Sequence, residues 1–165
     1  MEGDAKLLVV GAGSTYYTCP VRIFVRDTIG DLFVEEQRLE GGQGVQESYG
    51  YNLDILKGGE FLAVSAHQAH YDGEFLAGSI YIYARDNSNL FQLVERFDGK
   101  YKLESLGERG FSIDISQKSL VVSAASNRRV DKTYRIFKVS WCDYCSIQSI
   151  FCMNRNYKSF INSAS

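Results

Sequence analysis

The strongest constraint on this chain is that it repeats itself. Three short apolar runs occur along it, LVVGAG at 8–13, LAVSAH at 62–67 and LVVSAA at 120–125. Self-similarity at a spacing of about 20–50 residues or slightly more is the signature of a repeat architecture, and it outranks any reading of a single run. We therefore interpret the chain as one supersecondary unit written three times.

Further elements accompany each apolar run in a fixed order. The element before the run is GYNLDI at 50–55 and GFSIDI at 110–115, with a weak echo, KSFINSA, at 158–164. The element after it is VRIFVRD at 21–27, IYIYARD at 80–86 and YRIFKVS at 134–140. The last element is LFVEEQRLEG at 32–41 and LFQLVERFDG at 90–99, with a degenerate copy at 145–154. This order predicts a single domain, 1–165, with approximate repeats 1–48, 49–106 and 107–165.

Each element has the composition of a β-strand. The chain contains 11 Tyr and 10 Phe but a single proline, and turn residues such as Gly58-Gly59 and Asp72-Gly73 separate the elements. The leucine-led runs are continuously apolar, which favours strands buried on both faces. We predict an all-β fold of propeller-like blades, each with four antiparallel strands. An open or stacked β-sandwich built from the same hairpins is the alternative.

The pattern resembles the FG-GAP repeats that form the propellers of integrin α-chains. The resemblance runs from about Lys6 to Asn162 and depends on GYNLDI, GEFLAVSA and GSIYIYARD in the middle repeat, and on GFSIDI and QKSLVVSAAS in the third. It implies a β-propeller that acts through its surfaces. Calcium-binding members carry a carboxylate-rich loop between the first two strands. The corresponding segments here, 56–60 and 116–119, are short and poor in carboxylates, so we expect a calcium-free variant.

Three blades are too few for a closed ring, which has about 4–8. The first repeat also lacks the strand that precedes its apolar run. The chain is therefore a piece of a longer propeller, a ring closed by two or three copies, or an arc whose ends another subunit covers. Because the sequence begins with Met1, we rank closure by copies or by another subunit above the first option. We expect self-association or a protein partner to cover the open blade edges.

The first apolar run also resembles a nucleotide-binding loop. Gly11 and Gly13 fit the first two glycines of a dinucleotide fingerprint, but Tyr16 stands at the third. The sister runs have Ser65 and Ser123 in place of Gly11, and a strand rather than a helix follows. We therefore expect a small residue at a close packing contact, and no cofactor.

The cysteines offer two further chemistries. The motif WCDYC places Cys142 and Cys145 at the spacing of a redox pair, but at the tip of a predicted hairpin rather than at a helix N-terminus. A turn with buried thiols or a local disulfide between them are the structural alternatives. A zinc site would combine Cys142, Cys145 and Cys152 with Cys19, His67 or His70, although a single Cys-x-x-Cys is a weak signal.

The segment 67–75 after the second apolar run contains both histidines of the chain. His67 and His70, with Asp72 nearby, are weak candidates for a metal or small-ligand site, and neutral surface histidines are the favoured interpretation. Two histidines in one segment do not define a hydrolytic triad, so we expect no enzyme. The recurring pairs Arg26-Asp27 and Arg85-Asp86 predict a turn begun by Asp and an apolar edge covered by Arg.

The charge balance excludes other partner classes. Lys and Arg number 18 and Asp and Glu 20, without the basic surplus of a nucleic-acid-binding protein. No apolar stretch approaches the roughly 20 residues of a membrane-spanning helix. The sequence thus predicts a non-catalytic protein-interaction or assembly subunit that binds neither nucleic acid nor a bilayer core.

Overall fold

The computed structural model describes residues 6–11, 20–41, 47–56, 58–116, 119–125, 134–140 and 160–162, and these form an all-β structure. Sheet 1 has the strand order β1-β2-β3, sheet 2 β4-β5-β6-β7 and sheet 3 β11-β10-β9-β8, and every pairing is antiparallel. The strands are β1 Leu7–Val10, β2 Val21–Val25, β3 Val34–Leu39, β4 Tyr49–Ile55, β5 Phe61–Ala66, β6 Ser79–Arg85, β7 Phe91–Asp98, β8 Phe111–Ser116, β9 Ser119–Ala125, β10 Tyr134–Ser140 and β11 Phe160–Asn162.

The internal repeat extends to strand register. In sheet 1 Leu8 lies opposite Phe24, and in sheet 2 the equivalent Leu62 lies opposite Tyr83. Both sheets also carry a register shift at the same place, after Ile23 in β2 and after Ile82 in β6. Such irregularities bend a strand locally. Equivalent residues of the first two repeats therefore occupy equivalent places in three dimensions.

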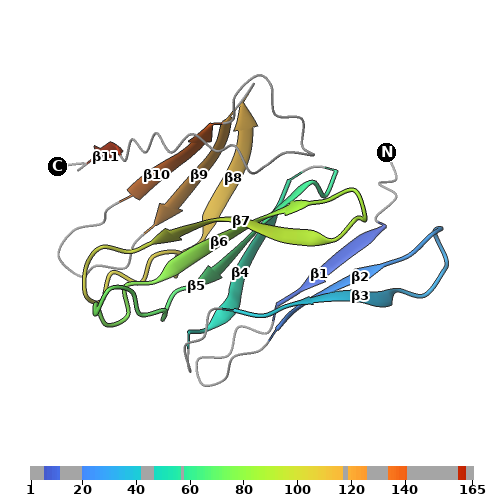
Figure 1. Cartoon of the computed structure of the whole chain (residues 1–165), viewed down its shortest axis with the longest axis horizontal. Coiled ribbons are helices and arrows are strands. Elements are labelled where there is room, and N and C mark those ends of the chain that lie inside the picture. Colours follow the sequence, from blue (N-terminus) through green and yellow to red (C-terminus); the bar gives the residue numbers. More distant parts are fainter. Residues whose placement is uncertain are drawn as a thin grey trace.

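Sheet 2 lies between the other two sheets, and the three form an open row (Figure 1). One apolar cluster joins sheet 1 to sheet 2 and includes Val21, Ile23, Leu62, Val64 and Tyr83. A second cluster joins sheet 2 to sheet 3 and includes Ile80, Ile82, Phe97 and Ile113. Because side chains alternate between the faces of a strand, β5, β6 and β7 of sheet 2 each contribute to both clusters.

The same apolar run has different burial in sheets 1 and 2. In β5 all six residues are buried, which confirms the prediction of a strand covered on both faces. In β1 the residues alternate between half-buried and exposed, so that prediction is wrong for the first run. The difference arises because only one face of β1 packs against another sheet.

The closing strand of the chain does not occupy the predicted place. The KSFINSA segment was expected to echo the element that precedes the apolar run, which forms β4 and β8. Instead β11 pairs with β10, on the side opposite β9, so it stands where β3 and β7 stand in their sheets. The degenerate copy at 145–154 lies outside the described residues.

Candidate interaction surface

One face of sheet 1 has no second sheet packed against it in the described part of the chain. It carries Leu8 and Val10 of β1, each 41% exposed, and beside them in register Phe24 and Arg22 of β2. We call these four residues the outer face of sheet 1. The opposite face carries Leu7 and Val9, which pack against the cluster shared with sheet 2.

The same positions in sheet 2 are buried. Leu62 and Val64, the equivalents of Leu8 and Val10, are 0% exposed, and Tyr81 and Tyr83 occupy the places of Arg22 and Phe24. All four belong to the cluster between sheets 1 and 2. Large apolar side chains that recur at one face of a repeat are suited to a neighbouring sheet, and in sheet 1 that neighbour is missing from the described residues.

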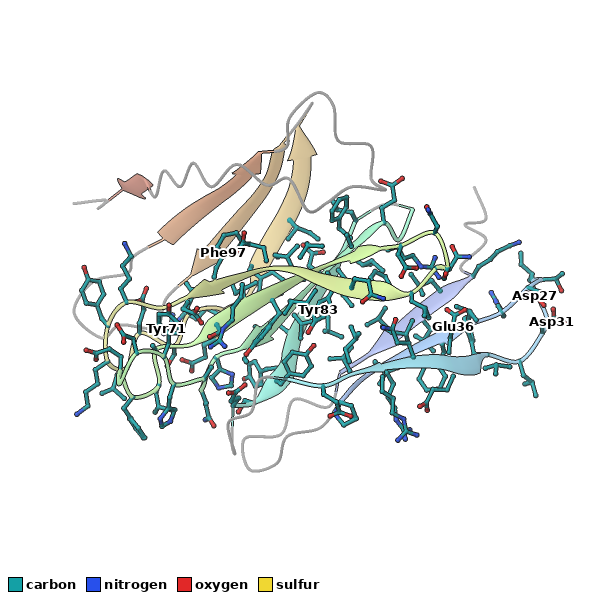
Figure 2. The ribbon with its side chains drawn as sticks, in the orientation of Figure 1. Asp27, Asp31, Glu36, Tyr71, Tyr83 and Phe97 are labelled. Atoms are coloured by element: carbon teal, nitrogen blue, oxygen red, sulfur yellow. The ribbon has the colours of Figure 1, made fainter. Side chains whose placement is uncertain are left out.

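The buried equivalents also satisfy their polar atoms. The hydroxyl oxygens of Tyr49 and Tyr83 lie 2.6 Å apart inside the cluster, and Figure 2 labels Tyr83. Burial raises the pKa of the Tyr83 hydroxyl, and the hydrogen bond from Tyr49 partly offsets this shift. Burial likewise raises the pKa of Tyr49. Both phenols therefore stay neutral and hold each other in place.

A charged border runs along the outer face of sheet 1 at β3. Arg38 forms a hydrogen-bonded ion pair with Glu35, and the Arg22 guanidinium lies 3.5 Å from the same carboxylate. The hydrogen bond from Arg38 is the main reason that the pKa of Glu35 is lowered. An apolar patch with a polar border is the usual anatomy of a protein interface.

Side-chain contacts fix sheet 1 against sheet 2. The Gln37 amide accepts a hydrogen bond from the Phe91 N–H and donates one to the Phe91 carbonyl, both at 2.8 Å. The Arg85 guanidinium of sheet 2 lies 3.8 Å from the Glu36 carboxylate of sheet 1. Figure 2 labels Glu36. Sheet 1 is therefore held in one orientation with its outer face turned away from sheet 2.

The recurring Arg-Asp pairs behave largely as predicted. Arg26 lies over the Phe33 ring at 4.7 Å, and the equivalent Arg85 lies over the Phe91 ring at 5.5 Å, so each Arg covers an apolar edge. Asp86 begins its turn by accepting hydrogen bonds from the Ser88 and Leu90 N–H groups.

In the first repeat a different aspartate closes the turn. Asp31, rather than Asp27, accepts hydrogen bonds from the Thr28 N–H and hydroxyl. Figure 2 labels both aspartates at the tip of the β2–β3 hairpin. The prediction for Asp27 is therefore wrong.

The histidine segment is divided between the interior and the surface. The His67 side chain is buried, at 5% exposure, and its ring lies 4.2 Å from the Tyr51 ring. Burial lowers its pKa, and the Glu108 carboxylate opposes the shift. His70 and Asp72 are exposed, and the His70 ring contacts Phe75 at 4.6 Å. The expectation of surface histidines is thus wrong for His67, because it follows a buried strand.

The described part of the chain offers little for metal binding or thiol chemistry. No group of three or more His, Cys, Asp or Glu side chains suited to a metal occurs there. Cys19, Cys142, Cys145 and Cys152 lie outside the described residues, so the redox, disulfide and zinc hypotheses stay predictions.

Gly11 of the apparent nucleotide loop has a packing role. A Cβ atom at this position would lie 2.3 Å from the Gly50 carbonyl oxygen, closer than any side chain tolerates. The expectation of a small residue at a close contact is confirmed, and a strand, β2, follows at Val21. Residues 12–19 between them lie outside the described residues.

A scan of the chain against known protein-family models finds no match, and no curated protein matches it. Among the described residues no helix is long and apolar enough to cross a membrane. The repeat itself offered a sign of the outer face that sequence reasoning missed: Arg22 and Phe24 stand where sheet 2 has two tyrosines.

Proposed function

We propose that this chain is a segment of propeller-like, FG-GAP-type blades that acts as a non-catalytic assembly or recognition module through the outer face of sheet 1. The observation that carries the proposal is the burial of the repeat-equivalent face in sheet 2. Leu62 and Val64 are fully buried there, whereas Leu8 and Val10 are 41% exposed.

The stacking of the sheets supports this role. Sheet 2 has a neighbour on each face, as a blade inside a propeller does, whereas sheet 1 has a neighbour on a single face among the residues that the structure describes. A further sheet would complete the row at sheet 1, and a second copy or another subunit is the source that we propose.

The free energy gained by apolar burial, set against the cost of association, indicates how large the contact at the outer face of sheet 1 must be. Fully burying an aliphatic side chain contributes about 1.5–3 kcal/mol, whereas association costs at least about 4 kcal/mol in lost freedom. Leu8 and Val10 are only 41% exposed, so covering them contributes less than half of that range each, and these two residues alone do not suffice. The contact must extend over Phe24 and the charged border at Arg22 and Glu35, which would give it orientation.

The solution mass tests self-association directly. Light scattering of the purified full chain should give a multiple of 18.6 kDa that dissociates on dilution. The double variant Leu8→Arg/Val10→Arg should give the monomer mass with an unchanged circular dichroism spectrum. Leu32→Arg is the matched control, because Leu32 is 87% exposed in a turn and should leave the mass unchanged.

A stable monomer would exclude self-association and leave another subunit as the partner. A monomer for which the Leu8→Arg/Val10→Arg change alters neither solubility nor capture of partner proteins would contradict the proposal.

A second candidate is a small-ligand or metal site at residues 67–75. The favouring observation is that the buried Nδ1 atom of His67 has no hydrogen-bond partner among the described residues. Calorimetric titration with Zn²⁺ of the full chain, of His67→Gln and of His70→Gln tests it. Binding that both substitutions abolish would favour this candidate, and no heat of binding would reject it for zinc.

A further inference from the structure

The edge strand of sheet 1 has a free side. β1 pairs with β2 along one edge, and no other strand in the described part of the chain pairs with its second edge. The Lys6 carbonyl accepts a hydrogen bond from the Arg26 N–H, so Lys6 directs its backbone toward β2. Backbone direction alternates along an antiparallel strand, and Leu7 and Val9 therefore direct their N–H and C=O groups to the free edge.

The equivalent edge is occupied in the other two sheets. β5 is flanked by β4, and β9 is flanked by β8. The two pairings share one register. In each of them a run of Leu or Ile, then Asp, then Ile in the flanking strand (β4 or β8) lies opposite equivalent residues of the apolar run (β5 or β9). The pairs are Leu53↔Val64, Asp54↔Ala63 and Ile55↔Leu62 in sheet 2, and Ile113↔Val122, Asp114↔Val121 and Ile115↔Leu120 in sheet 3.

A groove accompanies the free edge. A cavity of about 280 Å³ is lined by Leu7, Val9, Leu53, Asp54, Ile55 and Leu62, and the Asp54 carboxylate itself is hydrogen-bonded to Ile113 of β8. Small-molecule sites commonly enclose about 300–1,000 Å³ and combine apolar walls with several converging polar groups. This groove is smaller, and its lining from β1, β4 and β5 is aliphatic except for Asp54, so it is better suited to the side chains of an added strand.

The contact between sheets 2 and 3 shows how such a strand is held. There the Asp54 carboxylate accepts a hydrogen bond from the Ile113 N–H at 2.9 Å, across the two sheets. The Asn52 amide donates to the Gly107 carbonyl at 2.7 Å. Leu56 packs against the adjoining cluster. In β4 and the residue after it, the residues that face sheet 3 therefore follow the pattern Asn-x-Asp-x-Leu, and the equivalent positions at β8 are Ser112, Asp114 and Ser116.

We propose that the free edge of β1 binds an extended segment of another polypeptide as a fourth antiparallel strand, with the pattern polar–aliphatic–Asp–aliphatic. The aliphatic residue before the Asp pairs with Val10, the Asp with Val9, and the following aliphatic residue with Leu8. The Asp side chain enters the groove and accepts a hydrogen bond from the Leu53 N–H, the counterpart of the Ile113 N–H. Backbone pairing supplies affinity, and the Asp and its neighbours supply specificity.

This inference rests on the proposed role of sheet 1 in protein contacts, and it names the segment that would be bound. A second copy is a poor source of the strand, because its own β4 and β8 are already paired with β5 and β9. Taking either one would break an existing sheet.

The test uses the full chain and a synthetic peptide of the sequence SYGYNLDIL, which repeats residues 48–56. Amide exchange followed by NMR should show slowing of at least tenfold at Leu7 and Val9 on addition of the peptide. Leu8 and Val10 already bond to β2 and should change little. A peptide with Lys in place of its Asp should bind at least tenfold more weakly.

The variant Val9→Pro removes a free-edge N–H, which an edge strand tolerates, and should abolish peptide binding. Leu32→Pro in the exposed turn serves as the matched control and should bind as the unaltered chain does.

Absence of peptide binding would overturn the inference. Slow exchange at Leu7 and Val9 before peptide is added would also overturn it, because the edge would then be covered by the chain itself or by a second copy. These amide readouts do not depend on the solution mass. A failure of strand binding is therefore distinguishable from a failure of face-to-face association.

Discussion

Sheets 1 and 2 are built from the same elements, yet they differ in what covers them. Their apolar runs share register and neighbouring strands, but sheet 2 has a fourth strand, β4, and a sheet on each face. In the described residues, sheet 1 has three strands, and another sheet packs on only one of its faces. The comparison teaches that a repeated strand pattern encodes the faces of a sheet, whereas the burial of those faces depends on neighbours.

Truncating the equivalent leucines of sheets 1 and 2 should reveal the largest difference in stability between the two sheets. Leu62→Ala removes a fully buried side chain and should lower the free energy of unfolding by about 2–5 kcal/mol. Leu8→Ala removes a side chain that is already 41% exposed and should cost less than about 1.5 kcal/mol. Urea unfolding of both variants measures the difference. Equal losses would mean that Leu8 is covered in solution.

Removing the Gln37 side chain should loosen sheet 1 from sheet 2. Gln37→Ala leaves the Phe91 N–H and C=O without their side-chain partner and should cost about 1–3 kcal/mol. Hydrogen exchange should accelerate more in sheet 1 than in sheet 3. Gln92→Ala, which removes an exposed hydrogen bond to Asp86, is the control and should cost less than about 0.5 kcal/mol. Uniform acceleration across all sheets would argue against a local link.

Exchanging the aromatic residues at one repeat position should sharpen the contrast. Tyr83→Phe leaves the buried Tyr49 hydroxyl without its partner and should cost about 1–2 kcal/mol, part of which Tyr49→Phe should restore. The reverse change at the equivalent position, Phe24→Tyr, adds a hydroxyl to the outer face of sheet 1 and should be nearly neutral. Thermal unfolding of the three variants measures these effects. A large cost at Phe24 would indicate a covered face.

The smallest effect should be a pH dependence confined to sheet 2. Burial lowers the pKa of His67 below its ordinary value of 6.5, so the unfolded chain binds the proton more readily than the folded chain does. The stability is therefore complete above about pH 6.5 and falls as the pH drops through the folded pKa. His67→Gln should flatten the unfolding profile in this range, whereas His70→Gln should preserve it. A profile unchanged by His67→Gln would contradict the assignment.

Much of the local structure was predictable from sequence. Aromatic-rich elements and continuously apolar runs predicted the strands, and recurrence predicted which strands share a sheet position. Arg26 and Arg85 were placed over apolar edges for the same reason, because their neighbours recur. Asp31 was missed because a turn can be closed by any nearby carboxylate.

The sequence by itself determined the strands, their alternation and the equivalence of Leu8 with Leu62, since these follow from local chain geometry. Only the tertiary structure decided that Leu62 is buried and Leu8 exposed, that His67 lies inside, and that Gln37 joins two sheets through Phe91. The physical reason is that burial and hydrogen bonding across sheets depend on contacts between residues far apart in the chain. A repeat pattern gives every copy the same faces, and it leaves open which copies have a neighbour to cover them.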